Sequence, residues 1–315
     1  MIIFFGSSEY SIPALKALLD AGFKVVVVTT PDKPVGRKQI LTPNPLSQFS
    51  QDKRLPVFKI DQWTESQIPK DLTTAIKKSQ IGVCCVYGKI LPRWLIKKFK
   101  KGILNIHPSL LPKYRGASPA VGIILNQEKT SGFTIIKMDE KIDHGPIVFQ
   151  EKFTLPGNIT ALSYYQQIFQ KAALRLPTII NHYLSGLLKS RPQNHQKASF
   201  TFVLKKEDGF LRQDLLKKAI NQEKVCFENL PPIFKNLLFK PQRKYCASRI
   251  VFNLYRAFYP WPGIWTTIKI GNQNKRLKII NVHLEKGKLV VDCVQLEGKK
   301  PTEFLQFKKD YYWDF

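Results

Sequence analysis

The sequence has 315 residues, which is enough for one large domain with a sizeable core and a smaller second domain. No apolar run approaches the roughly 18 residues that cross a bilayer, and the apolar start lacks the features of a signal peptide, so we expect a soluble, cytoplasmic protein without a membrane partner. Lysine and arginine number 50 against 23 acidic residues, a net charge of +27. This charge favours a polyanionic partner, although a basic proteome or a need for solubility would produce it equally well.

The cysteines form an odd set without the paired spacing of metal ligands. Two of them are neighbours inside an apolar run. We therefore expect reduced, buried thiols and no metal site. The five are Cys84, Cys85, Cys226, Cys246 and Cys293.

The first half of the chain alternates apolar strands with amphipathic helices, which predicts an α/β domain with a mostly parallel, Rossmann-like sheet. A strand over 2–5, a helix over about 12–19 and a strand over 23–29 form the first βαβ unit. The turn after the first strand contains Gly6 but no G-x-G-x-x-G, which disfavours a dinucleotide site.

Further strands are expected over 81–87, 103–107, 133–138 and 147–153, with helices over 92–98, 119–125 and about 161–176. The stretch Pro31 to Pro45 has four prolines and several basic residues, so we expect a basic loop that forms neither helix nor strand.

A polar segment with few apolar residues separates the two halves. We place a catalytic domain at 1–188, a linker at 189–204 and a second domain at 205–315. In the second domain, helical patterns over 210–220 and 247–257 precede strand-like runs over 264–270, 277–283 and 289–295. These runs predict a small, OB-like β-barrel.

Two polar side chains mark the end of the strand over 103–107. Asn105 and His107 alternate with Leu104 and Ile106, so both project from one face. Ligand sites in parallel sheets lie at such strand ends. Acyl transfer to an amine needs a donor to the oxyanion and a base for the amine proton, and an amide and an imidazole supply both. Asp143, in a later loop, could orient the imidazole, although alone it also suits an ordinary turn.

Three motifs surround the candidate residues: Asn105-Ile106-His107-Pro108-Ser109-Leu110-Leu111-Pro112-Lys113-Tyr114-Arg115-Gly116-Ala117-Ser118-Pro119, Gly132-Phe133-Thr134, and Ile142-Asp143-His144-Gly145. Together they resemble the folate-dependent formyltransferases. Three more motifs are Ile3-Phe4-Phe5-Gly6-Ser7, Pro31-Asp32-Lys33-Pro34-Val35-Gly36-Arg37, and Arg256-Ala257-Phe258-Tyr259-Pro260-Trp261-Pro262. These are similar to the branch of that family that formylates methionyl-tRNA. The resemblance covers nearly the whole chain.

The resemblance implies a catalytic triad in which Asn105 holds the formyl oxygen, His107 shuttles protons and Asp143 orients His107. It also implies a site for 10-formyltetrahydrofolate. The residues that it places at that site are Ser109, Leu110, Leu111, Pro112, Val86, Tyr87, Gly88, Ile90 and Leu91.

The resemblance further implies that Arg37 of the basic loop reaches the acceptor end of tRNA, with Lys33 and Lys38 beside it. A solvated proline-rich turn is the alternative for this loop. Two positions depart from the tRNA enzymes: Pro108 replaces their usual glycine, and His144-Gly145-Pro146 lacks an acidic residue common there.

The second domain departs more, with an apparent insertion around 221–246 and a barrel that is short of strands. The inserted cations could follow tRNA phosphates or form a solvated surface. They are Lys235, Lys240, Arg243 and Lys244.

The resemblance implies an enzyme that transfers the formyl group of 10-formyltetrahydrofolate to initiator methionyl-tRNA for translation initiation, with the second domain at 205–315 binding the tRNA. We also expect a monomer. A sugar or small-metabolite N-formyltransferase would use the same three side chains, and a nucleic-acid-binding protein with an inert site is a third possibility. The basic loop and the net charge argue against the second, and the intact triad against the third.

Overall fold

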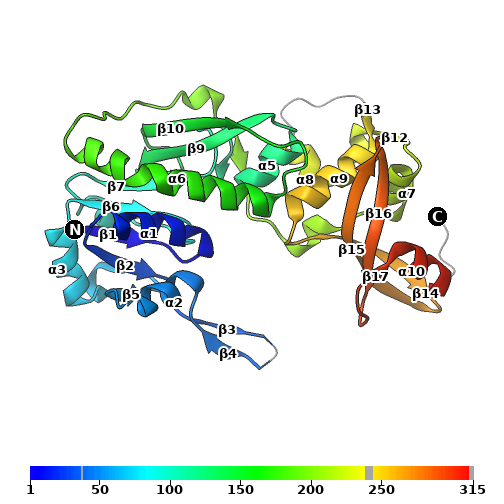
Figure 1. Ribbon diagram of the computed structural model, residues 1–315, viewed down its shortest axis with the longest axis horizontal. Coiled ribbons are helices and arrows are strands. Elements are labelled where there is room, and N and C mark those ends of the chain that lie inside the picture. The colour runs from blue at the N-terminus through cyan, green and yellow to red at the C-terminus, as the bar shows by residue number, and fades with distance from the viewer. Residues whose placement is uncertain (37, 238–243, 312–315) are drawn as a thin grey trace. The chain divides into compact units, whose positions relative to one another are not determined.

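The computed structural model describes residues 1–36, 38–237 and 244–311. The chain divides into two compact units (Figure 1). The first comprises 1–115, 131–153 and 165–199, and the second comprises 116–130, 154–164 and 200–315. The domain limits expected from the sequence stay a prediction.

In the described part of the chain, the first unit is built on a seven-stranded sheet of order β10-β9-β7-β6-β1-β2-β5 (Figure 1). The pairs β5/β2, β2/β1, β1/β6 and β6/β7 are parallel, and β9 is antiparallel to β7. The mostly parallel sheet predicted from the sequence is confirmed. Its strands are β1 Ile2–Phe5, β2 Val25–Thr29, β5 Val57–Lys59, β6 Ile81–Cys84, β7 Ile103–His107, β9 Thr130–Lys137 and β10 Ile147–Thr154.

The central strands are continuous apolar runs, as strands covered on both faces require. All residues of β1 and β2 are buried. The helices that accompany the sheet are α1 Ile12–Asp20, α2 Pro45–Asp52, α3 Lys70–Lys78, α4 Arg93–Ile96 and α6 Ala161–Leu184, of which α6 belongs mainly to the first unit.

Helix α6 continues past the expected end at residue 176, through Pro177. Proline removes one backbone donor, but Ile179 and Ile180 beyond it are buried and keep the apolar face of the helix in the core. Packing therefore outweighs the local cost of the proline.

The expectation that the basic loop contains no strand is wrong. The strands β3 Lys33–Val35 and β4 Ile40–Thr42 pair antiparallel, with Pro34 opposite Leu41. A proline is tolerated there because a two-stranded ribbon consists only of edge strands, where a missing backbone donor can face solvent. Gly36 and Gln39, both at positive φ, flank the turn.

The expected strand over 81–87 ends at Cys84. The chain turns there because Val86 and Gly88 take positive φ values of 49° and 76°. A β-branched residue in the left-handed region is strained, and such strain concentrates at functional sites.

A four-stranded antiparallel sheet of order β14-β15-β16-β17 lies in the described part of the second unit. It fits the small, shortened barrel expected from the sequence. The insertion contributes a separate ribbon, β12/β13. The strands are β12 Lys224–Cys226, β13 Lys244–Cys246, β14 Ile264–Ile270, β15 Gln273–Glu285, β16 Lys288–Leu296 and β17 Thr302–Glu303, and the short strands β8 Arg115–Gly116 and β11 Phe200–Thr201 pair with each other.

Helix α9 organises the core of this unit, because it contacts α5, α7 and β15. Its buried Ile250, Val251, Leu254 and Phe258 recur at the spacing of one helical face. The helices are α5 Pro119–Leu125, α7 Gln213–Ile220, α8 Pro232–Leu237, α9 Ala247–Phe258 and α10 Phe304–Tyr311. No helix in the described ranges is long and apolar enough to cross a bilayer.

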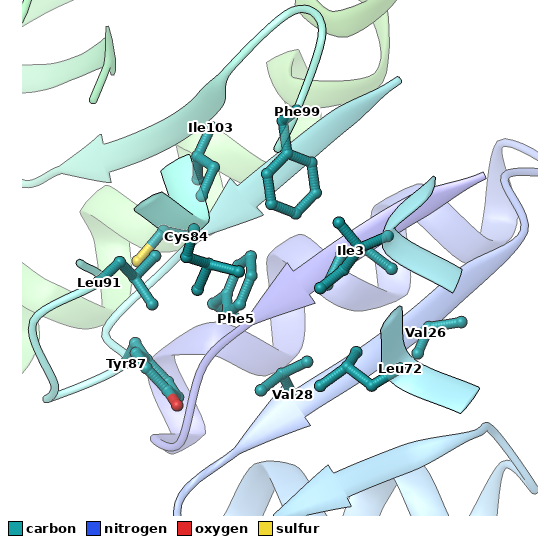
Figure 2. Packing of buried hydrophobic residues seen from close by; sticks show 12 residues of the cluster. Ile3, Phe5, Val26, Val28, Leu72, Cys84, Tyr87, Leu91, Phe99 and Ile103 are labelled. Carbon is teal, nitrogen blue, oxygen red and sulfur yellow. The ribbon is translucent and has the colours of Figure 1, made fainter. Parts of the chain in front are cut away.

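The largest side chains of the first core gather around Phe5, which is fully buried (Figure 2). Its ring lies edge-on to Trp63, Tyr87 and Phe99, with centroid distances of 6.0, 5.8 and 6.1 Å. Such aromatic pairs add to the stabilisation from burial.

Replacing Phe5 with alanine should lower the free energy of unfolding by about 3–5 kcal/mol, because it removes a ring from a packed interior and leaves a cavity. Urea unfolding followed by circular dichroism would measure the loss. Leu174→Ala is the matched control, because Leu174 is 80% exposed and should change stability by less than about 0.5 kcal/mol. Equal losses in both variants would contradict the assignment of Phe5 to the core.

Candidate active site

The candidate site lies at the carboxyl end of β7, the strand next to parallel β6. Asn105 and His107 lie opposite Ile136 and Thr134 of β9, two positions apart, so they project from the same face of β7. Strand β9 then leads into the loop that carries Asp143. Two side chains come from one strand and the third from the loop after its antiparallel neighbour.

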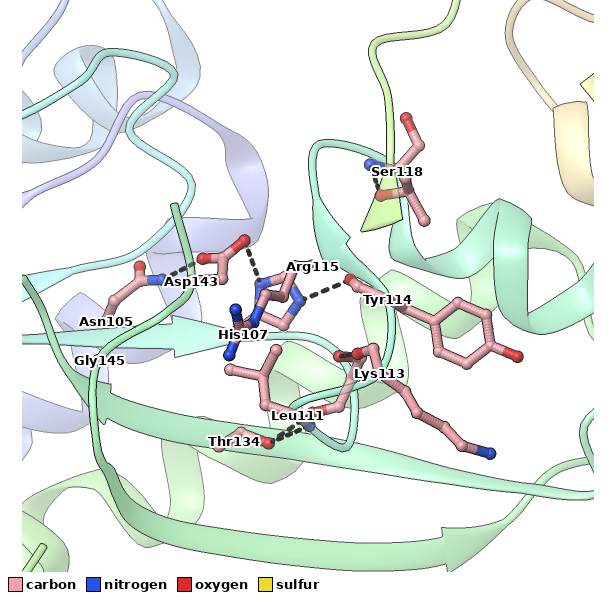
Figure 3. A network of polar contacts seen from close by, with 12 residues as sticks. Asn105, His107, Leu111, Lys113, Tyr114, Arg115, Ser118, Thr134, Asp143 and Gly145 are labelled. Carbon is pink, nitrogen blue, oxygen red and sulfur yellow. Dashed lines mark hydrogen bonds and ion pairs between the residues drawn. The ribbon is translucent and has the colours of Figure 1, made fainter. Parts of the chain in front are cut away.

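The structure brings the three expected catalytic side chains together (Figure 3). Asp143 Oδ2 lies 3.5 Å from His107 Nδ1, and Asn105 Nδ2 donates a long hydrogen bond of 3.4 Å to Asp143 Oδ1. The side chains of His107 and Asp143 are only 5% and 12% exposed. A pair this well shielded from water interacts much more strongly than a surface pair.

The other ring nitrogen of His107 is fixed by the backbone. His107 Nε2 lies 3.0 Å from the carbonyl oxygen of Tyr114, to which it can donate a proton. In that tautomer Nδ1 faces Asp143 with its lone pair and can take up a proton there. The imidazole is thus held between a carboxylate and a carbonyl, an arrangement that can store a proton and release it.

Unusual backbone conformations hold both partners of His107. Asp143 and Tyr114 have positive φ values of 48° and 61°. Gly145 also constrains the Asp143 loop, because a Cβ there would lie 1.9 Å from the carbonyl oxygen of Lys137. Only glycine allows this approach, and the hydrogen bond from Lys137 N to Pro146 O closes the loop at 2.9 Å.

Two buried residues without an assigned role in the sequence support the same loop. Gln193 donates to the carbonyl oxygens of Asp143 and Gly145 at 2.9 and 2.7 Å. Its own amide oxygen accepts a 2.6 Å hydrogen bond from Arg115. Gln193 falls in the segment read as a linker, and nothing in the sequence singled it out there.

Arg115 is 3% exposed and also contacts His195 Nδ1 at 2.8 Å. Burial lowers the pKa of the Arg115 guanidinium, while the nearby carboxylates of Asp143 and Asp139 raise it. Partial desolvation, with the charges of His144 and Arg115, lowers the pKa of His195, which favours the neutral ring that can accept from Arg115. The rings of His144 and His195 stack at 4.0 Å.

The expected folate segments leave the ends of neighbouring parallel strands, since 86–91 follows β6 and 109–112 follows β7. Ser7 Oγ donates to the carbonyl oxygens of Val86 and Tyr87 at 3.2 and 2.9 Å, and Thr134 Oγ1 donates to that of Ser109 at 2.6 Å. Both segments are therefore held firmly by the sheet.

Exposure differs widely among these residues, and their contact with folate stays a prediction. Tyr87, Leu91, Ser109 and Leu111 are buried, and Ile90 is 77% exposed. The partly buried or exposed remainder consists of Val86, Gly88, Leu110 and Pro112.

All five cysteines are unbridged, as expected, but only Cys84 and Cys85 are buried. Cys246 is exposed and Cys226 and Cys293 are partly buried, so the expectation of buried thiols is wrong for these three. Burial raises the pKa of the Cys84 thiol to about 12, and the charge of Asp143 adds to the shift. The thiol is therefore neutral near pH 7 and unsuited to nucleophilic attack, although Cys84 lies opposite Asn105 in the sheet.

Lys33 and Lys38 of the basic hairpin are exposed. Arg37, Lys240 and Arg243 lie outside the described residues. Of the other inserted cations, Lys235 donates to the carbonyl oxygen of Glu228, and Lys244 is exposed on β13. Among the described residues, no group of three or more His, Cys, Asp or Glu is placed to hold a metal ion.

The chain matches the formyl transferase family over residues 1–180 and the formyl transferase C-terminal domain over 246–289. It is 40% identical to the methionyl-tRNA formyltransferase of Chloroflexus aggregans, over 84% of this chain and 75% of that protein. It is 31% identical to the methionyl-tRNA formyltransferase of Roseiflexus castenholzii, over 98% of this chain and 95% of that one.

Among solved structures, the chain resembles an N-formyltransferase from Helicobacter canadensis in complex with folinic acid and dTDP-3-aminofucose. The TM-score is 0.58 at 21% identity, over 90% of this chain and 88% of that one. This likeness supports the fold. The chain belongs to the formyl transferase family. The curated relatives reported above are the family's methionyl-tRNA enzymes.

Removing the expected catalytic side chains should slow formyl transfer according to the roles predicted for them. Asn105→Ala should slow the reaction about 10²- to 10³-fold through loss of an oxyanion donor, and His107→Ala about 10²- to 10⁴-fold through loss of the base. Single-turnover formyl transfer would measure both. The control is Lys141→Ala, an exposed residue of the Asp143 loop. Wild-type rates in either triad variant would contradict the assignment.

Gln193→Ala should lower kcat about tenfold with little change in KM, because the Asp143 loop loses two backbone hydrogen bonds while the donor and acceptor sites keep their side chains. The pH profile of kcat should shift, since Asp143 no longer faces His107 at a fixed distance. Gln196→Ala, at an exposed neighbour, is the control. A lower unfolding midpoint with an unchanged kcat and pH profile would make Gln193 a structural residue only.

Proposed function

We propose that this formyltransferase moves the formyl group of 10-formyltetrahydrofolate to the amino group of initiator methionyl-tRNA, in the cytoplasm and as a monomer. The observation that carries the proposal is the convergence of Asn105, His107 and Asp143 within 3.5 Å at the end of β7. Support for the tRNA substrate comes from the net charge of +27 and from relatives of that name over most of the chain.

In the proposed reaction the amine nitrogen attacks the formyl carbon, and the carbonyl oxygen becomes an oxyanion. The Asn105 amide nitrogen, which also donates to Asp143 Oδ1, donates to this oxyanion. His107 takes the amine proton at Nδ1, directly or through one water, and the charge of Asp143 stabilises the imidazolium. The bond from the formyl carbon to the folate nitrogen then breaks, and His107 returns the proton to that nitrogen.

The folate donor is proposed to lie along the segments 86–91 and 109–112, with its formyl group toward Asn105. The basic hairpin is proposed to bind the tRNA. Lys33 and Lys38, with Arg37, would contact phosphates at the acceptor end of the tRNA, for which exposed cations on a projecting ribbon are suited.

The direct test supplies 10-formyltetrahydrofolate, labelled in its formyl group, with either charged initiator tRNA or a nucleotide-linked amino sugar. We expect label in methionyl-tRNA and none in the sugar. The rate at subsaturating tRNA should fall steeply with salt, because each neutralised phosphate adds about 0.9 to the slope of log affinity against log salt on a duplex. Formylation of the sugar alone, or a rate independent of salt, would reject the tRNA substrate.

A further inference from the structure

The second unit contains a cavity of about 620 Å³ that the proposed chemistry does not use. It lies between the segment 157–160, helix α9 and the turn that joins β15 to β16. Two arginines of α9 line it, Arg249 and Arg256, together with the ring of Tyr255. The motif that begins at Arg256 therefore contributes a charged wall to a cavity.

Arg256 is a buried cation that forms no ion pair with any carboxylate among the described residues. It is 5% exposed, and it donates to the carbonyl oxygen of Ile159 at 3.0 Å and to Asn253 Oδ1 at 2.7 Å. Its Nε has no hydrogen-bond partner among the described residues, and no described carboxylate forms an ion pair with Arg256 or Arg249. Burying a charge is costly unless an opposite charge compensates it.

The surroundings keep the cavity positive. Burial lowers the pKa of Arg256 to about 10, with a further contribution from the charge of Arg249, so the guanidinium remains protonated near pH 7. His283 also lines the cavity, and Asp292 Oδ2 lies 3.0 Å from its Nδ1. Asp292 is thus engaged with an imidazole, and no carboxylate in the described ranges forms an ion pair with either guanidinium.

We propose that this cavity binds one phosphodiester of an RNA backbone, held by the exposed guanidinium of Arg249 and the field of Arg256, with the adjoining base against Tyr255. The RNA partner rests on the proposed function. Guanidinium groups suit phosphate oxygens, and aromatic rings suit bases of any sequence. The cavity is larger than a single phosphate requires, and it offers space for the attached nucleoside.

The test measures binding of uncharged initiator tRNA to the full chain by fluorescence anisotropy, at several salt concentrations and without any formyl donor. Arg249→Gln should weaken binding about tenfold and reduce the salt slope by about 0.9. Lys217→Gln, which removes one exposed cation of α7 in the same unit, is the charge-matched control and should leave both nearly unchanged.

Arg256→Lys tests the buried residue with its charge retained, and its circular dichroism spectrum and unfolding midpoint show whether it folds. We expect a loss of tRNA affinity beyond that of the control. If Arg256→Lys does not fold, Arg249→Gln still decides the proposal. Equal affinities and slopes for Arg249→Gln and Lys217→Gln would overturn it.

Inorganic phosphate and a nucleoside monophosphate form the comparison arms. If either saturates the cavity in the wild-type chain while tRNA binding is insensitive to Arg249→Gln, the ligand is a free phosphate compound and the RNA assignment is wrong. The two proposals can fail separately. If Arg249→Gln loses tRNA affinity but the wild-type chain transfers no formyl group to methionyl-tRNA, the proposed function is wrong and the RNA site stands.

Discussion

The candidate site depends on the return of the chain from β9 to the end of β7. Strand β7 can supply only Asn105 and His107 on one face, because the intervening Ile106 points to the other. The third group has to come from elsewhere, and Asp143 follows 38 residues after Asn105. The antiparallel pairing of β9 with β7, and the close approach of Gly145 to the Lys137 carbonyl oxygen, place that carboxylate beside the imidazole.

This arrangement explains why the surrounding polar groups bond to backbone atoms. The Asp143 loop has few apolar side chains of its own, so packing alone cannot hold it in a strained conformation. Gln193 supplies two hydrogen bonds to its carbonyl oxygens, and Tyr114 supplies the carbonyl that fixes the other side of His107. A rigid frame around the imidazole keeps the three side chains in a fixed arrangement.

The sequence was sufficient where the physical signal is local. The alternation of side chains along a strand predicted that Asn105 and His107 share a face, and apolar runs predicted the parallel sheet. Asp143 was a candidate from its loop position alone, but only the resemblance separated it from an ordinary turn residue, because no local rule connects it to a strand 36 positions earlier. Gln193 was missed because a side chain that bonds to carbonyl oxygens leaves no pattern in the sequence. The strands around Pro34 were missed because proline was taken to exclude a strand, although edge strands tolerate it.

Two buried arginines, one in each unit, differ in the charges that surround them. Arg115 lies in the field of Asp143 and Asp139, whose charges offset the cost of its burial and make it part of the frame around the site. Arg256 is buried to a similar degree, yet within the described part of the chain the charge that shifts its pKa is that of another cation, Arg249. Burying the Arg256 guanidinium costs free energy that a nearby anion would offset. In this chain of net charge +27, the described protein residues beside Arg256 supply no such anion.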